Sequence, residues 1–118
     1  MNAFSITQQA VDDDVHVIAV TGYLDFDAAP RLKRCIVDCI EAGGRRLVVD
    51  LSDAGFIDST GIGVLAGALK RLREGGGSLV VVCTHENVRS IFELVGLDDL
   101  IPLHQSRDDA ISALARAA

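Results

Sequence analysis

The segment from Phe56 to Gly67, FIDSTGIGVLAG, places a carboxylate, two hydroxyls and three glycines in what otherwise looks like a helix. Asp58, Ser59 and Thr60 are residue types that begin helices more readily than they fill them, and glycine lowers helix stability. Three kinds of chemistry suit such a run: nucleotide binding, nucleophilic catalysis by a hydroxyl, and modification of a hydroxyl by another enzyme. A structural role is the fourth interpretation, in which Asp58 or Ser59 caps a helix and contributes about 1 kcal/mol.

Nucleotide binding is disfavoured by the spacing of the glycines. Gly61-x-Gly63-x-x-Ala66 matches the loose dinucleotide pattern, and Glu86 follows at about the required twenty residues. That pattern needs its first glycine at the end of a strand, whereas the preceding apolar run ends at Leu51. The Gly-Lys-Ser or Gly-Lys-Thr of a phosphate-binding loop is absent from the sequence. We therefore expect no nucleotide and no other cofactor.

Nucleophilic catalysis by Ser59 is disfavoured by the residues around it. The Gly-x-Ser-x-Gly turn of a nucleophile elbow is absent, since Ile57 and Gly61 flank the Asp-Ser-Thr run. No histidine falls in a segment that obviously returns to this loop with an orienting acid, and Asp58 would oppose a developing oxyanion. We therefore predict a protein that is not an enzyme, in which Ser59 is the residue acted upon.

Composition limits the partners that this chain can have. Its 118 residues are 49% hydrophobic and 24% charged, as in an ordinary globular protein, and predict a single domain over residues 1–118. Eleven basic against seventeen acidic residues give a net charge of −6, which argues against a nucleic-acid partner. No signal peptide is recognisable, and no apolar run approaches the roughly 20 residues of a membrane span. We expect a cytoplasmic protein without a membrane partner.

The three cysteines are expected to be structural. Cys35 and Cys39 lie four residues apart on the apolar face of a predicted helix, and Cys83 follows an apolar run. Two cysteines at this spacing can bind a metal, but no second pair of ligands lies at a suitable distance along the chain. We therefore expect no metal site, and small buried thiols of the kind found in a reducing cytoplasm.

Strands and helices alternate along the chain. Apolar runs predict four strands and a short fifth one, at residues 3–9, 15–22, 45–51, 78–84 and 100–104. Amphipathic patterns predict four helices, at residues 25–44, 59–74, 86–96 and 106–117. The close spacing of the first two strands favours an antiparallel pair. The sequence therefore predicts an α/β domain with a mixed, mostly parallel sheet of four to five strands, an N-terminal antiparallel hairpin and about four helices.

Two polar loops are expected to meet at one edge of this sheet. Loops after parallel strands gather at the carboxyl ends of the strands, where such folds bind their ligands. One loop, at residues 21–27, contains Asp25, and the other, at residues 52–60, contains Asp58 and Ser59. We therefore predict that Asp25 and the Asp58–Ser59 pair lie close together.

The chain resembles a known family over nearly its whole length. Residues 47–82, with flanking likeness from 17–33 to 87–103, resemble the anti-sigma factor antagonists, the small single-domain members of the STAS family. The run Asp-Ser-[Ser/Thr]-Gly-[Ile/Leu]-Gly-Val is the most specific signature of that family. Its first hydroxyl after the aspartate is the target of a cognate anti-sigma kinase. The resemblance therefore implies a STAS fold and phosphorylation of Ser59.

The resemblance also implies how the protein works. The unphosphorylated form would bind an anti-sigma factor serine/threonine kinase and release a sigma factor, phosphorylation would end this binding, and a phosphatase would restore it. Glycines would let the partner approach the helix, and carboxylates would oppose an added phosphate of about −1.5 to −2 charges. The expected partner-binding residues are Asp25, Asp58, Ser59, Thr60, Gly61, Gly63 and Val64. The alternative is a non-enzymatic STAS docking subunit of a sensory or transport complex.

One position departs from the family pattern. The family's Gly-Glu-[Ile/Leu]-Asp loop appears here as Gly22-Tyr23-Leu24-Asp25, so the aspartate is retained and Tyr23 replaces the glutamate. Where that glutamate helps to recognise the kinase, its replacement would shift the choice of partner and leave the fold unchanged.

Overall fold

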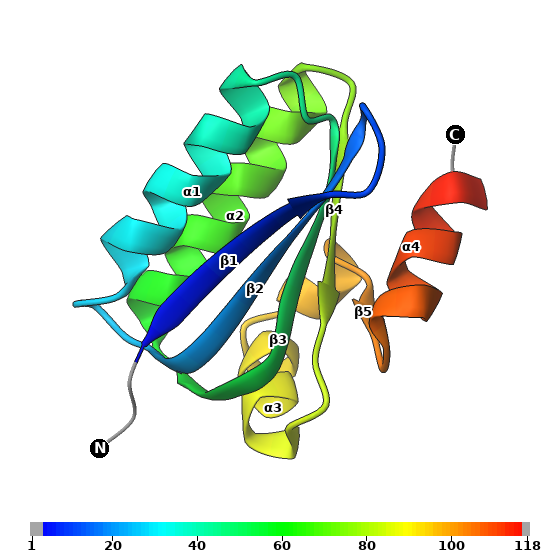
Figure 1. Ribbon diagram of the computed structural model, residues 1–118. Coiled ribbons are helices and arrows are strands. Elements are labelled where there is room, and N and C mark those ends of the chain that lie inside the picture. Colours follow the sequence, from blue (N-terminus) through cyan, green and yellow to red (C-terminus); the bar gives the residue numbers. More distant parts are fainter. Residues whose placement is uncertain (1–3, 117–118) are drawn as a thin grey trace.

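Five strands form one sheet in the computed structural model, which describes residues 4–116 (Figure 1). Their spatial order is β1-β2-β3-β4-β5, with β1 antiparallel to β2 and every later pair parallel. The strands are β1 (Ser5–Ala10), β2 (Val15–Leu24), β3 (Arg46–Ile57), β4 (Ser78–Val82) and β5 (Leu103–His104). The predicted mixed sheet and its N-terminal hairpin are confirmed.

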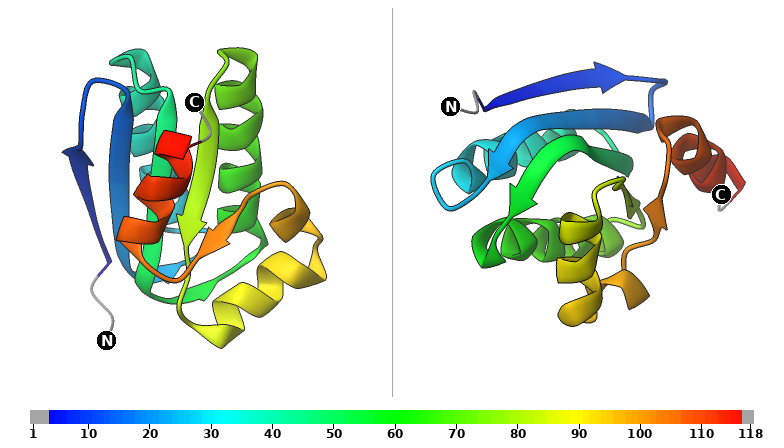
Figure 2. Two further views of the ribbon diagram at one scale, coloured as in Figure 1. Left: turned by 90° about the vertical axis from the view of Figure 1, so that its right-hand side faces the viewer. Right: turned by 90° about the horizontal axis from the view of Figure 1, so that it is seen from below.

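Helices cover both faces of this sheet. Figures 1 and 2 show α1 and α2 side by side against one face and α4 against the other. The helices are α1 (Ala29–Glu41), α2 (Ser59–Glu74), α3 (Glu86–Leu94) and α4 (Arg107–Arg116), with a 3-10 turn η1 (Leu97–Asp99) after α3. Among the helices of residues 4–116, none combines the length and the apolar character needed to cross a membrane.

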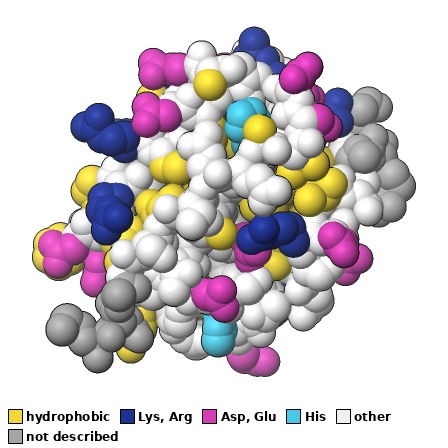
Figure 3. Space-filling model, in the orientation of Figure 1, with side chains coloured by type: hydrophobic (Ala, Val, Ile, Leu, Met, Phe, Trp, Pro, Cys, Tyr) yellow, Lys and Arg dark blue, Asp and Glu magenta, His cyan; other side chains and the backbone are white. Residues whose placement is uncertain are grey.

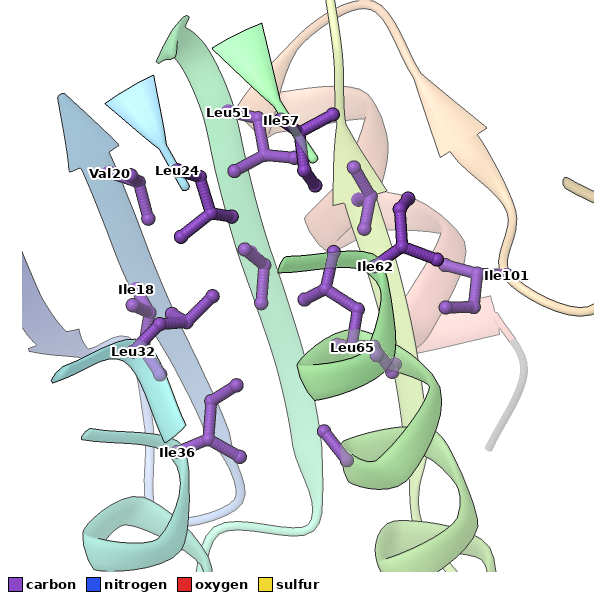
Figure 4. Packing of buried hydrophobic residues seen from close by; sticks show 14 of the residues in the cluster. Ile18, Val20, Leu24, Leu32, Ile36, Leu51, Ile57, Ile62, Leu65 and Ile101 are labelled. Carbon is purple, nitrogen blue, oxygen red and sulfur yellow. The ribbon is translucent and has the colours of Figure 1, made fainter. Parts of the chain in front are cut away.

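The core follows from the alternation of side chains along the strands. In β2, Ile18, Val20 and Leu24 face α1, α2 and α3, and Val15 and Val17 face α4 on the other side. Figure 4 shows the first group pointing into one interior together with side chains of the helices. Complete burial of such a side chain stabilises the fold by about 1.5–3 kcal/mol. The packing of strand side chains against the helices therefore holds the strand ends, and the loops that follow them, in place.

The third strand is longer than the sequence predicted. We expected a strand that ends at Leu51 and then a loop, but β3 continues to Ile57 beside β2. Two register irregularities interrupt the pairing of β2 with β3, and the buried residues Leu51, Ala54 and Ile57 follow one another at intervals of three. This spacing breaks the period of two by which a half-buried strand is recognised. The loop prediction for residues 52–57 is therefore wrong.

Candidate functional site

The start of α2 is built by one carboxylate. Asp58 has an extended backbone and is the N-cap, so that Ser59 is the first helical residue. The Asp58 Oδ1 atom accepts hydrogen bonds from the backbone N–H groups of Thr60 at 3.0 Å and Gly61 at 3.1 Å, and from the Thr60 hydroxyl at 2.6 Å. The helix-capping role that the sequence assigned to either Asp58 or Ser59 thus belongs to Asp58.

These hydrogen bonds also keep Asp58 charged. The Thr60 hydroxyl is the largest cause that lowers the pKa of Asp58, and the N–H groups of Gly61, Thr60 and Phe26 act in the same direction against the effect of desolvation. A carboxyl group with a pKa below its ordinary value of 3.8 is fully ionised at neutral pH. A fixed negative charge therefore lies next to Ser59.

Ser59 carries the available hydroxyl of this run. Its side chain is exposed, and its hydroxyl has no hydrogen-bond partner among the residues that the structure describes. The Thr60 hydroxyl, although also exposed, is occupied by Asp58. Of the two neighbouring hydroxyls, Ser59 is thus the one that an incoming enzyme can reach without breaking an existing hydrogen bond.

Strand pairing brings Asp25 and Asp58 to the same edge of the sheet, as the sequence predicted. Leu24, the last residue of β2, pairs with Ile57, the last residue of β3. Asp25 and Asp58 follow these two residues directly along the chain. The Asp58 N–H donates to the Leu24 carbonyl at 3.2 Å. The Asp25 carboxylate itself accepts hydrogen bonds from the N–H groups of Asp27 and Ala28, both at 3.1 Å, and so orders the turn that leads into α1.

The first two glycines of α2 have different surroundings. Gly61 is buried, and a Cβ atom there would lie 2.9 Å from Ile57 Cγ1, Leu24 Cγ and the Leu24 carbonyl oxygen. Glycine is therefore required at position 61 by packing inside the domain, and the sequence-based explanation that it opens the helix to a partner is wrong. Gly63 is exposed, and a Cβ atom there would meet nothing within 4 Å.

A groove between α1 and α2 begins at this site. It has a volume of about 440 Å³. Its lining, which defines the α1–α2 groove, consists of Lys33, Ile36, Val37, Ser59, Thr60, Gly63, Val64, Gly67, Ala68 and Arg71. Four predicted site residues, from Ser59 to Val64, thus belong to one wall. Sequence reasoning missed Gly67 and Arg71, although they continue the helix face of Ser59 and Gly63 at intervals of four residues.

Three aromatic residues are exposed near this site, and of these the sequence pattern singled out Tyr23 but not Phe26 and Phe56. The rings of Tyr23 and Phe56 lie 5.6 Å apart between centroids, with 56° between their planes. Tyr23 is 49%, Phe56 43% and Phe26 67% exposed. The chain has four phenylalanines, one tyrosine and no tryptophan, so most of its aromatic residues lie exposed around the ends of β2 and β3. Phe56 was missed because residues 52–60 were expected to form a loop, whereas it lies in β3.

All three cysteines are free thiols, and two of them lie in the core. Cys39 and Cys83 are buried as expected, whereas Cys35 is half-buried. Burial is the main cause that raises the pKa of Cys39, to about 12, with the neighbouring Cys35 next. Over residues 4–116, the His, Cys, Asp and Glu side chains form no group of three that could hold a metal ion.

Comparison with known proteins identifies the family. The STAS domain profile matches residues 7–110, and the chain therefore belongs to the STAS domain family. An anti-sigma-B factor antagonist of Staphylococcus epidermidis is 29% identical over 96 residues, which cover 81% of this chain and 89% of that protein. The crystal structure of an anti-sigma factor antagonist from Mycobacterium paratuberculosis has 30% identity and a TM-score of 0.88, and covers 96% of this chain and 95% of its own.

The fold is also shared with a more distant protein. The anti-sigma factor antagonist SpoIIAA in its unphosphorylated form superimposes with a TM-score of 0.74 at 20% identity, over 98% of this chain and all of the other. The five-stranded sheet with its N-terminal hairpin and four helices is thus the STAS fold.

Proposed function

We propose that this protein is an anti-sigma factor antagonist whose binding is controlled by phosphorylation of Ser59. The observation that carries the proposal is the arrangement at the start of α2. Asp58 and Thr60 are hydrogen-bonded to one another, and Ser59 between them is exposed without a partner among residues 4–116. The similarity to anti-sigma factor antagonists supports an anti-sigma factor as the partner.

The protein works by binding, without catalytic turnover of its own. Its unmodified form binds an anti-sigma factor serine/threonine kinase in the cytoplasm and releases a sigma factor. The kinase phosphorylates Ser59 and the complex separates, and a phosphatase regenerates the binding form. Asp25, Asp58, Ser59, Thr60, Gly63 and Val64 form or border the contact surface, whereas Gly61 supports it from inside.

The phosphate acts on the complex rather than on the fold. Two unit charges 4 Å apart in water repel by about 1 kcal/mol, and the ionised Asp58 lies next to the new anion. The N-terminus of α2 attracts an anion by about 0.3–1 kcal/mol, which offsets much of this repulsion within the free protein. A partner surface that covered Ser59 would have to desolvate about two negative charges, which costs far more than either local effect.

Phosphorylation assays on matched variants test the proposal. We expect the kinase to phosphorylate the parent and Thr60→Ala at Ser59, and to leave Ser59→Ala unmodified, as followed by mass spectrometry of residues 56–67. Titration with the kinase should show that Ser59→Ala binds with or without ATP, whereas the parent loses binding when ATP is present. Ser59→Asp should weaken binding only in part, because it adds one charge where phosphate adds nearly two.

Two results would overturn the switch. One is phosphate on Thr60 instead of Ser59, and the other is binding of Ser59→Asp as tight as that of the parent. Hydrolysis of nucleotides or esters by the pure protein, lost in Ser59→Ala, would contradict the absence of turnover.

A further inference from the structure

The α1–α2 groove extends well beyond the phosphorylation site. Its α2 wall runs from Ser59 to Arg71, a length of about 18 Å at 1.5 Å per residue. Its α1 wall contributes Lys33, Ile36 and Val37. This length matches about three turns of a second helix laid along α2, and is far longer than the contact that one serine needs.

Two glycines along this wall are not required by the domain itself. Gly63 and Gly67 are exposed in the middle of α2, and a Cβ atom at either position would meet nothing within 4 Å. Gly61 in the same helix differs, because its missing Cβ avoids contacts of 2.9 Å. Glycine in a helix interior is less stable than alanine. The open space above Gly63 and Gly67 therefore widens the groove at a cost to helix stability.

The charge of the groove is opposite to that of the protein. The chain has a net charge of −6, and acidic and basic side chains are interspersed over the face in Figure 3. The lining of the α1–α2 groove includes Lys33 and Arg71 and no carboxylate. The remaining lining is apolar or small. The groove thus presents an apolar floor with a cation on each helix, which is complementary to an amphipathic, acidic segment.

We propose that the α1–α2 groove binds an acidic amphipathic helix of the anti-sigma factor kinase, and this inference rests on the proposed function. Short apolar side chains of that helix pack over Gly63 and Gly67, and its flanking carboxylates pair with Lys33 and Arg71. Because Ser59 lines the same groove, a phosphate there places about two negative charges against this acidic helix. The groove thereby makes phosphorylation incompatible with its occupant.

Charge reversal at matched positions tests the proposal. Lys33→Glu and Arg71→Glu change the groove, whereas Arg34→Glu and Lys70→Glu change neighbouring exposed positions that line other hollows. All four variants alter the net charge equally, so that long-range repulsion is the same. We expect the unphosphorylated groove variants to bind the kinase at least about tenfold more weakly than the parent, and the two controls to stay within about threefold.

Filling the groove gives a second readout that is independent of charge. Gly67→Leu adds a side chain into open space two turns from Ser59, and leucine is the better helix former. We expect its Tm to be no lower than that of the parent and its affinity for the kinase to fall about tenfold or more. Its phosphorylation by a high concentration of kinase should still occur at Ser59.

The outcomes separate this inference from the proposed function. A parent protein that binds no anti-sigma kinase would overturn the proposed function. The groove assignment alone would be overturned if the parent binds the kinase and the groove variants bind it as tightly as the parent or as the controls Arg34→Glu and Lys70→Glu. Dimerisation of the parent that is abolished by Gly67→Leu, without an effect on kinase binding, would show a second copy of this chain in the groove and would equally overturn the proposal.

Discussion

Asp50 within β3 and Asp58 directly after it accept the same local pattern of hydrogen bonds in opposite environments. At Asp50, Oδ1 accepts hydrogen bonds from the Ser52 N–H at 2.9 Å and the Ser52 hydroxyl at 2.5 Å. At Asp58, Oδ1 accepts from the Thr60 N–H at 3.0 Å and the Thr60 hydroxyl at 2.6 Å. In each case a carboxylate is held by the residue two positions ahead.

The difference lies in what surrounds the two carboxylates. Asp50 is buried, and its Oδ2 accepts from Arg107 Nε at 3.1 Å and Nη2 at 2.9 Å, so that it fastens α4 to the sheet. The residue after it, Leu51, is completely buried, whereas the residue after Asp58 is the exposed Ser59. One Asp-x-hydroxyl unit thus fastens α4 to the sheet, and the other leaves the exposed Ser59 hydroxyl between its two members. The two units have the same local geometry, and they differ because Arg107 binds Asp50 in addition to Ser52.

Removing the Asp50 charge should give the largest loss of stability. Asp50→Asn leaves Arg107 without its carboxylate, and we expect the free energy of unfolding to fall by about 2–3 kcal/mol, less than for a fully buried pair. The expected loss is smaller than for a fully buried pair because the Arg107 side chain is 42% exposed. Urea denaturation measures the change. Kinase binding of the folded fraction should be unaltered, and a loss below about 0.5 kcal/mol would show that the Asp50 network does not hold α4.

Adding one methyl group at Gly61 tests how tightly the start of α2 is held. A Cβ at this position meets the Leu24 backbone oxygen at 2.9 Å. We expect Gly61→Ala to lower the unfolding free energy by about 1–3 kcal/mol through overpacking.

Gly63→Ala is the matched control for this methyl group. It adds the same group in open space and should raise the unfolding free energy by up to about 1 kcal/mol. Equal effects of the two substitutions, measured by chemical denaturation, would contradict the assignment of Gly61 to the interior.

Two substitutions of Asp58 separate its cap from its charge. Asp58→Ala should cost about 0.5–2 kcal/mol of stability through loss of the cap, whereas Asp58→Asn should retain the cap. Because the asparagine is neutral, Asp58→Asn removes a charge that repels the proposed acidic partner helix, and we expect phosphorylated Asp58→Asn to bind the kinase about fivefold more tightly than the phosphorylated parent, which corresponds to about 1 kcal/mol. Equal affinities of these two phosphorylated proteins would show that Asp58 acts as a cap only.

The smallest effect concerns the titration of Asp58. Its pKa is lowered in the folded protein, so its hydrogen bonds stabilise the fold above the unfolded pKa near 3.8 and lose this effect as the pH falls through the folded pKa. Thr60→Ala removes the largest cause and should raise the pKa towards its ordinary value. NMR titration of the carboxyl carbon measures the shift. An unchanged pKa would show that the backbone N–H groups alone lower it.

Local sequence signals predicted much of the fold and part of the site. Apolar periodicity located the five strands and the four α-helices, although not the 3-10 turn η1, since a core-facing stripe is a property of consecutive residues. The Asp-Ser-Thr run likewise marked the start of α2. The end of β3 escaped this method because its buried residues Leu51, Ala54 and Ile57 do not alternate. That pattern depends on the irregular pairing with β2.

By itself the sequence predicted an α/β fold with an N-terminal hairpin, and an aspartate and two hydroxyls at the start of its second helix. Only the tertiary structure decided which of these groups is available, because Asp58 and Thr60 satisfy each other and leave Ser59 exposed. It also decided that Gly61 packs inside, while Gly67 lies open in the groove that Lys33 also lines. The physical reason is that burial and charge at a site depend on neighbours from β2 and α1, which are remote along the chain and close only after folding.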